Sequence, residues 1–141
     1  MTVGILGLGL IGGSLARAYK LAGHTVYVKN RDERMLSFAM LSGAVDGKLN
    51  EDTIPQCDLI LLAIYPAGSA DWLEANAPLI SKRALVIDCC GTKQLVCQRC
   101  FPIAKEYGFF FVGGHPMAGS QFSGFKYSRA SLFQGAPMVL V

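Results

Sequence analysis

Charged side chains are scarce in this sequence. Asp, Glu, Lys and Arg make up 16% of its 141 residues and hydrophobic residues 52%, whereas about 25% charged residues is usual. This balance is typical of a parallel sheet that is buried on both faces. The net charge of +3 is small and the basic residues are scattered. The sequence therefore predicts one domain with a sizeable core and no nucleic-acid partner.

Long apolar runs and secretory signals are also missing. No stretch of about 18 apolar residues occurs, so we expect neither a transmembrane helix nor a membrane partner. The apolar N-terminus has no basic leader and contains five glycines before residue 14, which predicts a first strand rather than a signal peptide. Five cysteines without a secretory signal favour a reducing, cytoplasmic compartment.

The cysteines lack the pattern of a metal or redox site. Cys97 and Cys100 lie within an expected helix and no second pair accompanies them, so no metal is predicted. A redox pair would lie at the start of a helix, which this pair does not. Cys89 and Cys90 are adjacent, which strains a disulfide. We expect all five thiols to be reduced.

Short apolar runs alternate along the chain with segments of helical length. Six runs are expected to form strands: Val3–Leu6, Thr25–Val28, Leu59–Ile64, Ala84–Ile87, Phe109–Val112 and Met138–Val141. Four helices are expected between them, over about 12–22, 32–42, 67–77 and 92–107. Asp32 and Thr92 are expected to cap the second and fourth helices, and Pro102 to kink or split the fourth. The alternation predicts an α/β fold with a doubly wound, mostly parallel sheet of about six strands.

A glycine-rich turn follows the first expected strand. The motif G-x-G-x-x-G is formed by Gly7, Leu8, Gly9, Leu10, Ile11 and Gly12, and a helix is expected to open within it. Gly7 would permit the tight turn, Gly9 the approach of a pyrophosphate, and Gly12 the close packing of helix on strand. The free N–H groups at the helix start would hold the anion. In this context a Rossmann-type dinucleotide site is favoured over a glycine-rich turn without a ligand.

The end of the second strand indicates which dinucleotide is bound. NAD-binding domains usually carry Asp or Glu there, which bonds the ribose 2′-hydroxyl. Here that position is Asn30, and Arg31 follows. Asn30 could donate to a 2′-phosphate and Arg31 could pair with it, so NADP is favoured over NAD. Ala63 and Ile64, at the end of the third run, are further candidate cofactor contacts.

Four segments carry a family resemblance: Gly7–Ala16, Asp88–Lys93, Gly113–Gly119 and Leu132–Pro137. Together they resemble the N-terminal nucleotide-binding domain of prephenate and arogenate dehydrogenases, over the whole chain. The first segment is shared by many dehydrogenases, whereas His115-Pro116-Met117-Ala118-Gly119 is far more specific.

The resemblance implies NADP-dependent oxidative decarboxylation of prephenate or arogenate in tyrosine biosynthesis, by hydride transfer from the ring carbinol. It implies that His115 is catalytic and hydrogen-bonds the ring hydroxyl. An imidazole just beyond a strand's carboxyl end suits such a role. The resemblance also implies a following helical dimerisation domain. Because the chain ends within an apolar run, we expect residues 1–141 to be the cofactor-binding part of a homodimeric enzyme and to be inactive alone.

Substrate-side candidates show two departures from the family. Gly91 stands where some members carry Ser, although Thr92 beside it offers a hydroxyl and Lys93 follows. Gln121 stands where many carry Glu, which removes a charge. Two alternatives remain at this point: another Rossmann-type enzyme, such as a β-hydroxyacid dehydrogenase or an imine reductase, and a non-catalytic dinucleotide-binding module.

Overall fold

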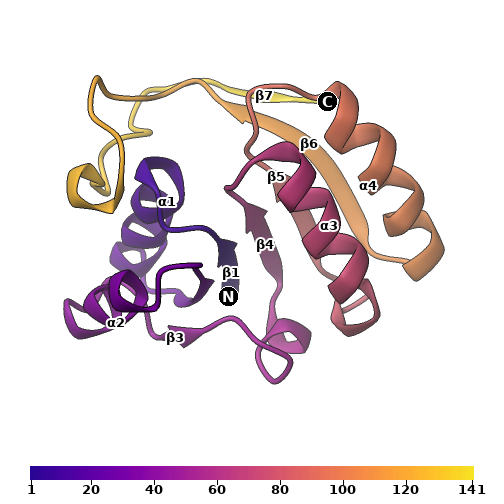
Figure 1. Cartoon of the computed structure of the whole chain (residues 1–141), viewed down its shortest axis with the longest axis horizontal. Coiled ribbons are helices and arrows are strands. Elements are labelled where there is room, and N and C mark those ends of the chain that lie inside the picture. The colour runs from indigo at the N-terminus through magenta and orange to yellow at the C-terminus, as the bar shows by residue number, and fades with distance from the viewer.

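The computed structural model describes residues 1–141, and it contains one sheet with helices on both faces (Figure 1). The sheet has seven strands in the order β3-β2-β1-β4-β5-β6-β7. Neighbouring strands are parallel except β6 and β7, which are antiparallel. Their bounds are β1 Thr2–Leu6, β2 Thr25–Lys29, β3 Gly47–Lys48, β4 Leu59–Leu62, β5 Leu85–Asp88, β6 Phe110–Pro116 and β7 Met138–Leu140. The predicted doubly wound α/β fold is confirmed.

Two hydrophobic cores lie on opposite faces of the sheet. Helices α1 (Leu10–Leu21) and α2 (Glu33–Leu41) cover one face, and α3 (Pro66–Asn76) and α4 (Gln94–Tyr107) cover the other (Figure 1). In β4, Leu59 and Leu61 belong to the core under α1 and α2. Ile60 and Leu62 belong to the core under α3 and α4. Since successive side chains of a strand point to opposite faces, a strand covered on both sides reads as an unbroken apolar run.

The six expected strands are present, and β3 is an additional one that the sequence did not predict. β3 consists of Gly47 and Lys48 alone, which pair with Tyr27 and Val28 at the edge of the sheet. Two residues, one of them charged, leave no apolar run to recognise. None of the helices combines the length and the hydropathy needed to cross a membrane.

The fourth helix is not split at Pro102, and its expected cap is wrong. α4 runs unbroken from Gln94 to Tyr107 with Pro102 inside it. Pro102 has no N–H to donate to the carbonyl of Gln98, one turn earlier. Because both residues are exposed, water can solvate that carbonyl. Thr92 does not cap α4, because the helix begins one residue later and its N-cap, Lys93, makes no side-chain capping bond.

The expected cap of α2 is confirmed. Asp32 precedes the helix, and its carboxylate accepts hydrogen bonds from the amides of Arg34 and Met35. These are two of the orphan N–H groups at a helix start, and a carboxylate there also suits the positive end of the helix dipole.

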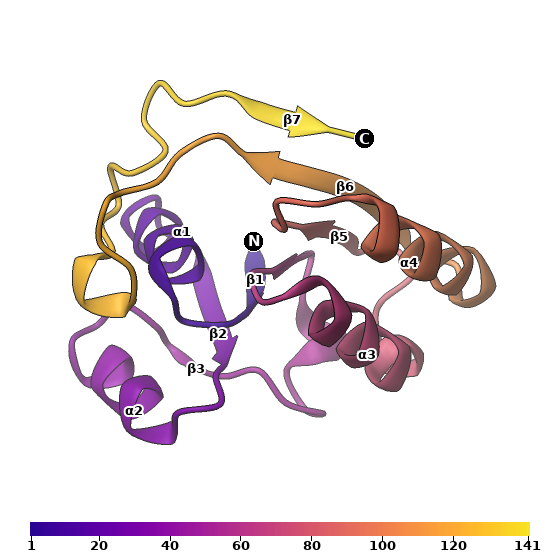
Figure 2. The same cartoon turned by 45° about the horizontal axis from the view of Figure 1, so that its top comes forward.

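The segment between β6 and β7 returns to α1 before β7 comes back alongside β6 (Figure 2). Near the start of α1, Ser14 Oγ accepts from the amide of Arg129 at 3.0 Å. One turn later, Arg17 donates to Ser128 Oγ at 2.9 Å and lies over the ring of Phe125, 4.5 Å from its centroid. These contacts fix the segment to the helix that opens at the glycine turn.

Candidate functional site

The glycine turn between β1 and α1 uses its three motif glycines for three different reasons. Gly7 has a φ of +100°, and a Cβ there would lie 2.6 Å from the carbonyl oxygen of Ala63. A Cβ on Gly12 would lie 2.0 Å from the carbonyl oxygen of Gly7. A Cβ on Gly9 would meet no protein atom within 4 Å. Gly7 and Gly12 are therefore required by the turn itself, whereas the space at Gly9 is open to a ligand.

The start of α1 is electrostatically free to receive an anion. The helix has no side-chain cap and no acidic residue in its first turn. Its hydrogen-bond ladder begins with Gly13 N donating to Gly9 O at 2.9 Å. The amides of Leu10 and Ile11 therefore precede the ladder, as the first N–H groups of any helix do. Such amides, together with the helix dipole, favour a phosphate.

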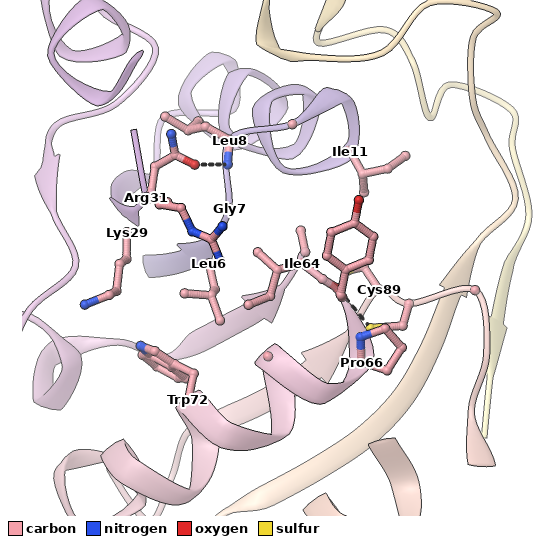
Figure 3. Close-up of a pocket in the computed structure, with 17 residues that line it drawn as sticks. Leu6, Gly7, Leu8, Ile11, Lys29, Arg31, Ile64, Pro66, Trp72 and Cys89 are labelled. Atoms are coloured by element: carbon pink, nitrogen blue, oxygen red, sulfur yellow. Dashed lines mark hydrogen bonds between the residues drawn. The ribbon is translucent and has the colours of Figure 1, made fainter. Parts of the chain in front are cut away.

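A cleft of about 1010 Å³ opens in front of this turn, where β1 lies between β2 and β4 and the strand order reverses (Figure 3). Ligands of open α/β sheets bind at such a switch point. The residues that line it are Leu6, Gly7, Leu8, Gly9, Ile11, Lys29, Asn30, Arg31, Ala63, Ile64, Tyr65, Pro66, Gly68, Trp72, Cys89, Cys90 and Gly91. They include two cations and no Asp or Glu.

The structure brings most of the expected cofactor residues together. Four residues of the motif, with Asn30, Arg31, Ala63 and Ile64, line the cleft. Leu10 does not line it, and Gly12 is buried in the packing of α1 on the turn. Sequence reasoning missed Lys29 and Trp72, which also line the cleft. Lys29 could have been found as the charged last residue of an apolar strand, whereas no local signal marks Trp72.

The side chain of Asn30 is engaged within the protein. Its Oδ1 accepts from Leu8 N at 3.1 Å, and its Nδ2 donates to the carbonyl of Asp32 at 3.1 Å. Asn30 therefore ties the glycine turn to the start of α2, a role that its sequence position alone does not reveal. Lys29 and Arg31 both line the cleft and lie on the same side of it (Figure 3).

His115 lies in a strand rather than in the expected loop. It is half-buried, one residue before the end of β6, and pairs with Val139 of β7. The antiparallel partner β7 explains the difference, because it extends β6 beyond its parallel pairing with β5, which ends at Gly113. His115 is not among the residues that line the cleft.

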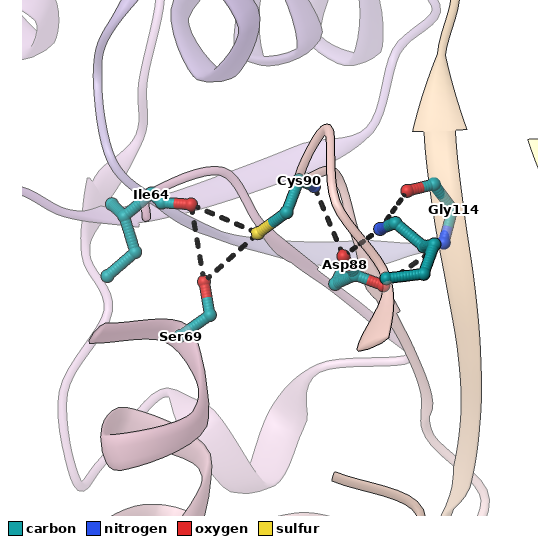
Figure 4. Close-up of polar contacts among 6 residues, drawn as sticks. Ile64, Ser69, Asp88, Cys90 and Gly114 are labelled. Atoms are coloured by element: carbon teal, nitrogen blue, oxygen red, sulfur yellow. Dashed lines mark hydrogen bonds and ion pairs between the residues drawn. The ribbon is translucent and has the colours of Figure 1, made fainter. Parts of the chain in front are cut away.

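The substrate-side candidates are dispersed. Gly91 lines the cleft, and exposed Thr92 follows it in the loop between β5 and α4. Lys93 turns inward, where its ammonium pairs with Asp88 and also donates to the carbonyl of Gly114 (Figure 4). Gln121 is exposed in the segment after β6.

The five cysteines are free thiols. Burial, and to a smaller extent the charge of Asp88, raises the pKa of Cys89 to about 12 although this residue lines the cleft. Burial also raises the pKa of Cys57 and of Cys100 to about 12. Such thiols stay protonated at neutral pH and are poor nucleophiles. No group of three or more His, Cys, Asp or Glu side chains is placed to hold a metal ion.

Comparison with known proteins places this architecture in a family. Residues 15–141 match the family described as "Prephenate dehydrogenase, nucleotide-binding domain". The chain belongs to the prephenate dehydrogenase family. This confirms the resemblance carried by its sequence segments, and it agrees with the dinucleotide cleft at the switch point of the sheet.

Relatives in the prephenate dehydrogenase family resemble the chain along nearly all its length. A prephenate dehydrogenase of Lactococcus lactis subsp. cremoris is 32% identical over 139 residues, which are 96% of this chain and 39% of that protein. The crystal structure of Synechocystis arogenate dehydrogenase superposes with a TM-score of 0.88 at 30% identity and covers 100% of this chain. A second crystal structure is that of prephenate dehydrogenase from A. aeolicus in complex with hydroxyphenyl propionate and NAD+. It superposes with a TM-score of 0.84 at 27% identity and also covers 100% of this chain.

The chain is shorter than these family members. It spans 39% of the Lactococcus lactis protein and 50% of each of the two solved chains. The match therefore concerns the nucleotide-binding part of the prephenate dehydrogenase family.

Proposed function

We propose that this chain is the cofactor-binding domain of an NADP-dependent dehydrogenase that oxidatively decarboxylates prephenate or arogenate. The observation that carries the choice of cofactor is the composition of the cleft. Lys29 and Arg31 line it, and no Asp or Glu does. A carboxylate would accept from the free 2′-hydroxyl of NAD, whereas two cations suit the 2′-phosphate of NADP.

The residues of the cleft fit a dinucleotide. The space at Gly9 is open to a pyrophosphate. The first amides of α1, which have no partner within the helix, can donate to its oxygens. Arg31, two residues beyond the end of β2, can form a bidentate pair with a phosphate, and Lys29, the last residue of β2, adds a second positive charge. Asn30 supports this arrangement indirectly, because it holds the turn against the start of α2.

In the proposed reaction His115 takes the proton. The ring hydroxyl of the substrate donates to the imidazole and transfers its proton as the carbon–hydrogen bond of the carbinol breaks. NADP, when bound, supplies the acceptor for that hydrogen and its electron pair. The ring carboxylate then leaves as carbon dioxide, its bonding electrons complete the aromatic ring, and the resulting phenolate oxygen takes the proton back from His115. General-base assistance of this kind contributes about 10²–10⁴-fold. The family match, which includes His115, supports this role.

The cofactor proposal is tested by titration calorimetry with NADP and NAD. NADP should bind more tightly, and Arg31→Ala should weaken it by about 1.5–3 kcal/mol, roughly ten- to a hundredfold, because a hydrogen-bonded charge pair is lost. NAD affinity should hardly change. Arg83→Ala, which removes an exposed arginine from the turn before β5, is the matched control. Equal affinities of the native chain for the two cofactors, or an equal loss for both in Arg31→Ala, would refute the assignment of the 2′-phosphate.

The catalytic proposal is tested in the complete native enzyme with both substrates. His115→Asn should lower kcat by about 10²–10⁴-fold while NADP affinity stays within twofold. The control is His24→Asn, which changes the other histidine, in the turn before β2. Near-native turnover by His115→Asn would show that another group accepts the proton. Tight NADP binding without oxidation of either substrate by the native enzyme would mean a different dehydrogenase reaction.

A further inference from the structure

β6 continues past the end of β5. Beyond the last backbone pair of the two strands, side chains form the hydrogen bonds to the backbone of β6. The last parallel pair is Asp88 with Gly113. The next donor in the β5 series would be the amide of Cys90, since bonds of a parallel ladder are evenly spaced. That amide turns back to Asp88 Oδ2 at 3.1 Å, and Lys93 Nζ donates to the carbonyl of Gly114 instead.

The same pair also holds the other polar group of Gly114. Asp88 Oδ1 accepts from Gly114 N at 3.1 Å, and Asp88 Oδ2 accepts from Lys93 Nζ. Carboxylate and ammonium thus contact both backbone groups of the residue that precedes His115 (Figure 4). A side chain on Gly114 would collide with this arrangement, since its Cβ would lie 2.7 Å from the carbonyl oxygen of Asp88.

This ion pair is buried and closely packed. The side chain of Asp88 is 0% exposed and that of Lys93 19%. The carboxylate of Asp88 accepts from three donors, the amides of Cys90 and Gly114 and the ammonium of Lys93. No buried side-chain polar atom is left without a partner. Buried pairs of this kind add little net stability compared with apolar residues, but they fix a specific geometry.

The network also reaches the cofactor cleft. Cys90 Sγ donates to the carbonyl of Ile64 at 3.2 Å, and Ser69 Oγ donates to the same oxygen at 3.4 Å (Figure 4). Ile64 and Cys90 line the cleft. A continuous chain of polar contacts therefore runs from the wall of the cleft at the end of β4, through the loop after β5, to β6 beside His115.

From these contacts we infer that Asp88 and Lys93 are positioning residues, which set the place of His115 relative to the cofactor cleft by holding the backbone of Gly114. The inference rests on the proposed role of His115. It also gives Lys93 a task other than binding substrate, because its ammonium is engaged by Asp88 and Gly114. A shift of about 1 Å in a catalytic group can cost roughly a hundredfold in rate.

The test compares three variants of the complete native protein. Lys93→Met removes the donor to Gly114 but leaves a buried carboxylate unpaired. The double variant Asp88→Asn with Lys93→Met removes both charges, so it keeps the site neutral and remains informative if the single variant fails to fold. Lys105→Met, which changes an exposed lysine in the last turn of α4, is the matched control.

Two measurements separate positioning from other roles. The double variant should lower kcat by about ten- to a hundredfold, with KM for the substrate and Kd for NADP within about threefold. Hydrogen exchange of the Gly114 amide should be at least about tenfold faster, because its strand is no longer held. Lys105→Met should leave all of these values at the native level.

The outcomes are distinct. Native kcat in the double variant, with fast exchange at Gly114, would overturn the inference and reduce the pair to a support of the fold. A raised KM with native kcat and native exchange would also overturn it, because Lys93 would then contact the substrate. A native protein that oxidises neither substrate would count against the proposed function, whereas unchanged exchange at Gly114 in the double variant would count against the positioning role alone.

Discussion

The motif glycines serve both the fold and the binding of a ligand. A pair of substitutions, at Gly9 and at Gly12, separates these two roles. Gly9→Ala places a methyl group where no protein atom lies within 4 Å. Gly9 has a φ of −81°, which alanine adopts without strain. Gly12→Ala places the same methyl group 2.0 Å from the carbonyl oxygen of Gly7.

The expected stabilities differ accordingly. For Gly9→Ala, the lower chain entropy of alanine stabilises by about 0.4–1 kcal/mol. The poorer N-cap costs a similar amount, so the net change is within about 1 kcal/mol. For Gly12→Ala, backbone must move to relieve the overlap, which costs about 3 kcal/mol. At roughly 4 °C per kcal/mol, Tm should stay within about 4 °C for Gly9→Ala and fall by about 12 °C for Gly12→Ala.

The expected affinities do not follow the stabilities. A methyl group at Gly9 occupies the space that we assign to the pyrophosphate and displaces about two hydrogen bonds to charged oxygens, each worth about 1.5 kcal/mol. NADP binding should therefore weaken by about 3 kcal/mol, or roughly a hundredfold in Kd, in a fully folded protein. Thermal unfolding followed by circular dichroism and titration calorimetry would measure both quantities. Native affinity in Gly9→Ala would refute the idea that a phosphate lies over this residue.

Two further predictions concern titrating groups. Because burial raises the pKa of Cys89 to about 12, its alkylation by iodoacetamide at about pH 8 should be more than a hundredfold slower than that of a free thiol; fast labelling, located by peptide mass spectrometry, would show that this wall of the cleft opens readily. Burial opposes a low pKa at Asp46, but hydrogen bonds from Lys20 and from the amide of Val26 outweigh it and hold the pKa of this carboxyl below its usual value. A depressed carboxyl pKa stabilises the fold above its unfolded value, and the benefit is lost as the pH falls through the folded value. The difference in urea midpoint between the native protein and Asp46→Asn should therefore shrink from about pH 6 to about pH 3, and a constant difference would contradict the ion pair as its source.

The sequence predicts features whose signals are local. The six apolar strands and the four intervening helices follow from spacing within a few residues, because burial on both faces makes each strand apolar throughout. The glycine turn is equally local, since Gly7 and Gly12 must approach each other within one turn of chain. The cap at Asp32 also depends only on the next three residues. These features, and the family itself, can be recognised from the order of the residues alone.

Other features depend on contacts between distant parts of the chain, which no local pattern specifies. Asn30 has the position of a cofactor ligand, but its side chain bonds to Leu8, which precedes it by 22 residues. Lys93 turns inward because Asp88 and Gly114 meet only when β5 and β6 lie side by side. His115 belongs to a strand because β7 returns to pair with it. The sequence by itself determined the architecture and the dinucleotide turn, whereas tertiary pairing decided which polar groups remain free for a ligand and which are used to hold the fold.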